Sequence, residues 1–111
     1  MPAELALNHL NIPARDPERL RAWYVEKLGF RAHGRFLWSG GTLLVFVEGD
    51  PLPGAKMHFG FRVESLEALE GWARRLEATV EGDAQYATFY LRDPEGNAFE
   101  IFHEPVPGVQ K

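Results

Sequence analysis

Two histidines and one glutamate are the residues of this chain whose types and spacing best suit metal chemistry. His9 and His58 occupy the same place in two similar segments, 49 residues apart. Trp23 and Trp72 repeat at the same spacing, and Glu100 lies on the last strand expected in the second copy. Two neutral imidazoles and one carboxylate suit a divalent metal that keeps open coordination positions. The pattern therefore predicts a metal site built from both copies.

Period-two alternation predicts which side chains share a face of each strand. His58 shares its face with Gly60 and Arg62, while the residues between them are apolar and are expected to pack on a helix. The same reasoning puts His9 and Glu100 on polar faces, away from the helices. One such residue by itself is more often a solvated surface group than a ligand. Symmetry between the two histidines, with a carboxylate on the same expected face, favours metal binding.

A second group of side chains is aromatic or polar and could line a small-molecule pocket, because such pockets combine an apolar wall with a few polar groups. Its members are Arg62, Trp38, Tyr86, Thr88, Arg92 and Phe102. Arg62 could bind an anionic substrate or pair with an acidic residue at the surface. A catalytic base would have to be a pocket group such as Tyr90, or a metal-bound hydroxide.

Composition excludes several classes of function. The 111 residues carry a net charge of −4 without a run of Lys or Arg, so nucleic acid or an anionic membrane is not an expected partner. The absence of cysteine excludes disulfides, thiolate ligands and a cysteine nucleophile. The sequence suggests neither a leader peptide nor a membrane span, so the cytoplasm is the expected location.

The elements expected to position these residues follow the order βαβββ twice, within one domain over residues 1–111. One module covers about residues 4–49 and the other about 55–104, with a Pro- and Gly-rich linker between them. Helices are expected after Asp16-Pro17 and after Ser65. The expected strands are 5–14, two within 30–39, 42–47, 57–63, 79–81, 88–92 and 98–103. Each half is too small to be stable alone, so the two must share a core or a sheet. The expected class is α+β.

Three segments resemble the vicinal oxygen chelate superfamily, which includes glyoxalase I, bleomycin and fosfomycin resistance proteins and extradiol dioxygenases. They are the opening 7–16 with Trp23-Tyr24 and Leu28-Gly29-Phe30, the segment 57–63, and the closing 90–101 with its Asp-Pro-Glu-Gly turn. The resemblance implies paired modules whose mixed sheet curls into a cup around a metal, with the helices outside. It also implies a homodimer that can exchange modules. The family's metal ligands fall on His9, His58 and Glu100.

One position departs from glyoxalase I, which has a second glutamate ligand on the last strand of its first module. Aligning Gly41 with Gly96 puts Val45 opposite Glu100 in the repeat. A reaction that needs two glutamates is therefore not expected.

Three functions follow as hypotheses. The first is a metal-dependent enzyme, in which Fe, Mn, Zn or Ni acts as a Lewis acid and chelates vicinal oxygens of a small substrate, in a lyase, thiol transferase or dioxygenase-like reaction. The alternative is a non-catalytic drug-binding protein like the bleomycin resistance proteins, with aromatic groove residues such as Trp38, Phe36 and Phe102. The third is a structural protein with vestigial histidines.

Overall fold

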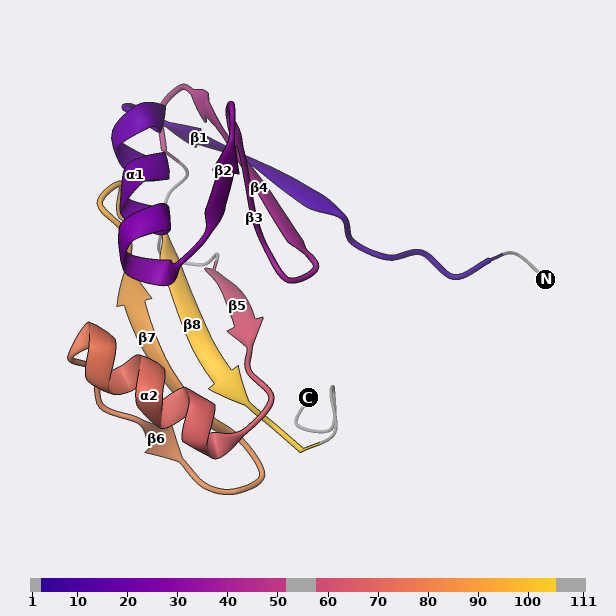
Figure 1. Cartoon of the computed structure of the whole chain (residues 1–111), viewed down its shortest axis with the longest axis vertical. Helices are drawn as coiled ribbons and strands as arrows, with labels where there is room; N and C mark the ends of the chain where they lie inside the picture. Colours follow the sequence, from indigo (N-terminus) through magenta and orange to yellow (C-terminus); the bar gives the residue numbers. More distant parts are fainter. Residues whose placement is uncertain (1–2, 52–57, 106–111) are drawn as a thin grey trace. The chain divides into compact units, whose positions relative to one another are not determined.

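The computed structural model describes residues 3–51 and 58–105. The chain divides into two compact units, Met1–Leu52 and Pro53–Lys111. Each unit has one helix and four strands in the order βαβββ, as labelled in Figure 1. The expected α+β class and the two βαβββ modules are therefore confirmed.

The first unit consists of β1 (His9–Ala14), α1 (Pro17–Leu28), β2 (Arg31–His33), β3 (Phe36–Ser39) and β4 (Thr42–Glu48). Its sheet has the order β1-β4-β3-β2. β1 and β4 are parallel, whereas the pairs β3–β4 and β2–β3 are antiparallel. The helix packs on one face of this sheet, against β4, β1 and β2.

The second unit consists of β5 (His58–Arg62), α2 (Leu66–Leu76), β6 (Glu81–Gly82), β7 (Ala87–Arg92) and β8 (Ala98–His103). Its sheet order, β5-β8-β7-β6, repeats that of the first unit strand for strand. β5 and β8 are parallel, and α2 packs against β8 and β7. The sequence repeat is thus a repeat of topology.

The two sheets also share their register. Asn11 pairs with Val45 in the first sheet, and Gly60 pairs with Glu100 in the second. Because Asn11 and Gly60 are 49 residues apart, Val45 is the structural counterpart of Glu100. The alignment expected from the two glycines is confirmed, and an apolar side chain lies where the second unit has its carboxylate.

Local sequence signals explain both helices. The Asp16 side chain accepts a hydrogen bond from the Arg19 N–H at 3.1 Å, and Ser65 caps α2 in the same way through the Ala68 N–H at 3.0 Å. Gly29 ends α1 in the left-handed conformation, with φ 71°. The buried side chains lie between each helix and its sheet: Leu20, Tyr24, Leu28, Leu44 and Phe46 in the first unit, and Leu69, Ala73, Phe89, Phe99 and Ile101 in the second.

Most expected strand bounds agree with the structure to within one residue, and two strands deserve comment. The first begins at His9 rather than Leu5, because His9 already pairs with Leu43 near the start of β4 and residues 3–8 are not part of a strand. Leu5 is fully exposed (100%) in an extended segment. The second strand of the second module is Glu81–Gly82 rather than 79–81, because the pairs of β6 with β7 are Glu81 with Thr88 and Gly82 with Ala87.

The expected start of β5 at residue 57 lies outside the described residues. Among the described helices, neither has the length and apolar character that a membrane crossing requires.

Candidate metal centre

His58 and Glu100 come together within the second unit. They lie on the parallel strands β5 and β8, on the face of the sheet away from α2. His58 Nε2 is 3.5 Å from Glu100 Oε1. The His58 side chain is about half exposed (49%), whereas Glu100 is 6% exposed. A buried carboxylate therefore faces an accessible imidazole.

Two hydroxyl groups hold the other oxygen of this carboxylate. Thr88 Oγ1 donates to Glu100 Oε2 at 2.6 Å, and Tyr86 OH donates to the same atom at 2.8 Å. Hydrogen bonds to an ionised carboxylate are shorter and stronger than those between neutral groups. They offset part of the cost of burying the charge and fix the orientation of the carboxylate.

Gly60 provides the space that the glutamate occupies. It is the direct partner of Glu100 in the ladder between β5 and β8. A Cβ atom at this position would lie 3.1 Å from Glu100 Cγ and 3.0 Å from Phe102 Cε1. These separations are shorter than ordinary van der Waals contact, so a residue with a side chain would press on both neighbours.

Tyr90 lies on the other side of Glu100, as its partner in the antiparallel ladder between β7 and β8. Its ring makes an edge contact with the His58 ring, with centroids 5.6 Å apart, and the residue is 52% exposed. Partial burial and the negative charge of Glu100 raise the pKa of Tyr90. The pKa of Tyr86 is raised by burial, by its hydrogen bond to Glu100 and by the charge of that carboxylate. Both phenols are therefore protonated at neutral pH.

Three other residues expected to line a pocket, Phe102, Arg62 and Arg92, make contacts within the second unit. Phe102 stacks on Tyr86, with ring centroids 5.4 Å apart and planes at 13°. Arg62 Nη2 donates to the Glu104 carbonyl at 2.7 Å. Arg92 Nη1 donates to the Gly96 carbonyl at 2.8 Å, across the turn between β7 and β8. Arg92 therefore stabilises that turn.

Trp38 and His9 belong to the first unit. Trp38 pairs with Leu43 on one side and Arg31 on the other, and it also borders a cavity of about 350 Å³ with Arg31 and residues 29, 39 and 40. His9 is exposed at the start of β1.

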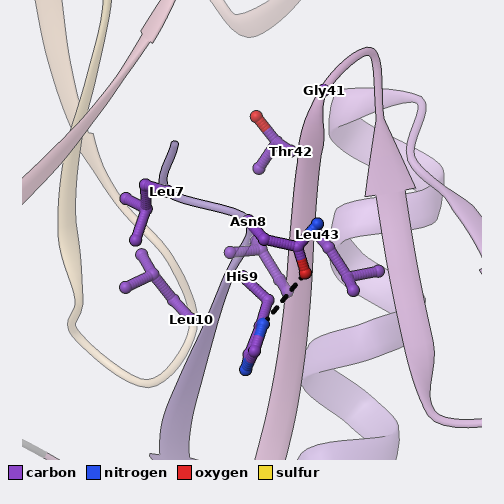
Figure 2. Close-up of a pocket in the computed structure, with 8 residues that line it drawn as sticks. Leu7, Asn8, His9, Leu10, Gly41, Thr42 and Leu43 are labelled. Atoms are coloured by element: carbon purple, nitrogen blue, oxygen red, sulfur yellow. Dashed lines mark hydrogen bonds between the residues drawn. The ribbon is translucent and has the colours of Figure 1, made fainter. Parts of the chain in front are cut away.

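The imidazole of His9 has one nitrogen engaged and one available for a ligand. Nδ1 lies 3.0 Å from the Asn8 side-chain oxygen, drawn as a dashed line in Figure 2. An amide oxygen only accepts, so in this orientation of the amide Nδ1 is the donor, and Nε2 is the nitrogen that a neutral ring would offer to a ligand. The ring lies beside a cavity of about 70 Å³ that is lined by residues 7–10 and 41–44.

The remaining histidines have other surroundings. His103 Nδ1 lies 2.9 Å from the Val63 carbonyl, which occupies one ring nitrogen, and His33 is exposed on β2. Over residues 3–51 and 58–105, no three His, Asp or Glu side chains form a cluster able to hold a metal. The structure therefore brings together two of the three expected ligands, and the participation of His9 stays a prediction.

Sequence reasoning missed the hydroxyl groups that hold Glu100. Tyr86 and Thr88 were expected to line a substrate pocket, whereas their hydroxyl groups are directed at the carboxylate. Strand alternation could have indicated this role in part. It puts residues 86, 88 and 90 on one face of the chain segment that precedes the Glu100 strand.

Comparison with known proteins extends this description to the whole chain. The family model described as a glyoxalase-like domain matches residues 9–102, which span both units. The chain belongs to this family. The expected resemblance to the vicinal oxygen chelate superfamily is thereby confirmed. No curated protein is similar enough in sequence to count as a relative.

Solved structures of the same fold come from several bacteria. A possible glyoxalase from Bacillus cereus has 24% identity and a TM-score of 0.73, over 88% of this chain and 98% of that one. A glyoxalase/bleomycin resistance protein/dioxygenase from Alicyclobacillus acidocaldarius has 24% identity and a TM-score of 0.71, over 93% and 94%. Lactoylglutathione lyase from Agrobacterium tumefaciens has 21% identity and a TM-score of 0.68, over 94% and 97%. At these identities the likeness concerns the fold.

Proposed function

We propose that the protein is a metal-dependent enzyme that acts on a small molecule, with His9, His58 and Glu100 as the ligands of a divalent ion of Fe, Mn, Zn or Ni. The observation that carries the proposal is the buried carboxylate of Glu100, with one oxygen held by two hydroxyl groups and the other facing His58 Nε2 at 3.5 Å. Buried carboxylates of this kind pair with a cation or bind a metal.

The donor pair fits a metal ion. Two ligand atoms about 2.1 Å from one ion, at an angle of about 90–110°, are roughly 3.0–3.4 Å apart. The measured separation of 3.5 Å between Nε2 and Oε1 is close to this range. His9, whose Nδ1 is engaged with the Asn8 side chain, could offer Nε2 as the third ligand. A divalent ion held by these residues would act as a Lewis acid and polarise vicinal oxygens of the substrate.

Tyr90 is the group of this chain best placed to contact the reacting part of a substrate. It is exposed, touches the His58 ring and lies opposite Glu100 on the sheet. In the metal-free protein its raised pKa keeps the phenol protonated, so it can donate a hydrogen bond to a substrate, and its part as a catalytic base stays a prediction. Arg62, Phe102 and Trp38 remain candidate substrate contacts.

We do not propose the lactoylglutathione lyase reaction for this chain. The pattern of glyoxalase I includes a second glutamate ligand, and here Val45 occupies the corresponding position in the register. A three-ligand site favours another reaction of the superfamily.

A second candidate is a non-catalytic small-molecule binder. It is supported by exposed aromatic side chains on strands, namely Tyr90 and Phe36, which is 43% exposed. Aromatic surfaces of this kind suit planar ligands. For either function we expect a homodimer in the cytoplasm.

Metal analysis of protein prepared without a histidine tag tests the proposal. We expect about one metal ion per chain after loading and dialysis, and its loss in His9→Ala, His58→Ala and Glu100→Gln. His33→Ala is the matched control, because His33 is exposed on β2 and lies outside the expected site. Wild-type protein that retains no metal, together with tight binding of a planar ligand, would favour the binder instead.

A further inference from the structure

The two oxygens of the Glu100 carboxylate have different surroundings. Oε2 accepts hydrogen bonds from Thr88 and from Tyr86, at 2.6 and 2.8 Å. Oε1 faces His58 Nε2 at 3.5 Å and lies above Gly60, 3.3 Å from the position that a Cβ would take there. With two donors on Oε2, its lone pairs are largely used, whereas Oε1 remains accessible to a ligand.

The chain fixes these two donors by its fold. Thr88 is 7% exposed on β7 and pairs with Phe102, so its hydroxyl group is held by the sheet. Tyr86 lies in the β6–β7 turn, where its N–H donates to Asp83 Oδ1 at 3.2 Å and its carbonyl accepts from the Asp83 N–H at 3.1 Å. Its ring stacks on Phe102. Both hydroxyl groups are therefore in place before any ligand binds.

We propose that Tyr86 and Thr88 are positioning residues that hold Glu100 Oε2 and so make Glu100 a one-oxygen ligand through Oε1. This inference rests on the proposed function, and it assigns the two residues a role other than the substrate contact expected from sequence. A carboxylate locked in this way keeps its position when the metal is lost. Binding through one oxygen would leave more of the ion's coordination to a substrate than binding through two oxygens.

Binding of Co²⁺ tests the proposal, with affinity measured by competition against a chelating dye and coordination followed by the visible absorption of the bound ion. Hydrogen-bonding partners of metal ligands typically contribute about 10- to 100-fold to metal affinity. We expect the dissociation constant to rise by about this factor in Thr88→Val and in Tyr86→Phe. We also expect the Co²⁺ absorption to weaken, because a released Oε2 can join the coordination and raise the coordination number.

Two controls separate positioning from packing. Thr88→Ser keeps the hydroxyl group and loses the methyl group, so its affinity and spectrum should match the wild type. Thr79→Val makes the same change as Thr88→Val at an exposed position and should have no effect. Circular dichroism verifies that each variant is folded.

The possible results are distinct. If folded Thr88→Val and Tyr86→Phe bind Co²⁺ with wild-type affinity and spectrum, the positioning role is wrong while the metal site stands. If Thr88→Ser loses as much affinity as Thr88→Val, packing explains the effect and the inference fails. If the wild type has no affinity for Co²⁺, or Glu100→Gln retains it, the proposed metal site itself fails.

Discussion

Substitution of Gly60 by alanine is the most direct perturbation of the candidate site. The added Cβ would lie 3.0 Å from Phe102 Cε1, 3.1 Å from Glu100 Cγ and 3.3 Å from Glu100 Oε1. Neither neighbour moves easily, because Glu100 is held by two hydroxyl groups and Phe102 is stacked on Tyr86. The new methyl group must therefore displace the carboxylate or bend the strand.

The expected magnitude follows from two opposing effects. Overpacking by one methyl group typically costs about 1–3 kcal/mol of stability. Replacing a strand glycine with alanine regains about 0.4–1 kcal/mol, because the unfolded chain loses conformational freedom. We expect a net loss of about 1–2 kcal/mol in the free energy of unfolding, together with weaker metal binding.

Urea unfolding of the metal-free protein, followed by circular dichroism, measures the first effect, and Co²⁺ titration measures the second. Gly71→Ala is the matched control: Gly71 lies inside α2, and its nearest contact is Arg74 Nη2 at 4.0 Å. This variant should gain about 0.5–1 kcal/mol, because glycine is a poor helix former. If both variants gain stability and Gly60→Ala binds Co²⁺ like the wild type, the close packing around Glu100 described above is wrong.

Three further predictions test the second unit. Ser65→Ala removes the cap on the Ala68 N–H and should cost about 1 kcal/mol in urea unfolding, whereas Ser65→Asp should restore most of it. Gly82→Ala should cost about 2 kcal/mol or more, because Gly82 has φ 97° and the new Cβ would collide with the Tyr86 carbonyl; a wild-type urea midpoint would refute this. The raised pKa of Tyr86 means that above about pH 10 the unfolded state loses a proton that the native state keeps, so stability should fall with rising pH. In chelator-treated protein this fall should be less steep in Tyr86→Phe, and equal slopes would contradict it.

Features set by neighbours in the sequence could be predicted. Asp16 with Pro17, and Ser65, mark helix starts because a cap acts on N–H groups within one turn. The polar face of His58 followed from strand alternation, which depends only on the period of the backbone. These signals were sufficient to place two ligand candidates on one face of a sheet.

Contacts between particular side chains of neighbouring strands could not be predicted, although the glycine alignment did predict Val45 as the counterpart of Glu100. The contacts of Thr88 and Tyr86 with Glu100 depend on how β7 pairs with β8, and a shift of one residue would turn those side chains to the opposite face. The start of β1 depended likewise on where β4 begins. No pattern within a single strand contains this information.

The difference between the two units indicates how a repeated fold acquires a one-sided site. Three paired residues on neighbouring strands show the difference. In the first unit they are Asn11 on β1, Val45 on β4 and Phe36 on β3. Their counterparts in the second unit are Gly60 on β5, Glu100 on β8 and Tyr90 on β7. A carboxylate in place of valine needs both space and hydrogen-bond donors, because a buried charge is costly without partners. Glycine at position 60 gives the space, and the hydroxyl groups of Thr88 and Tyr86 are the donors. Placing a glutamate at position 45 would therefore not by itself create a second such ligand, since Asn11, which has a side chain, occupies the position of Gly60.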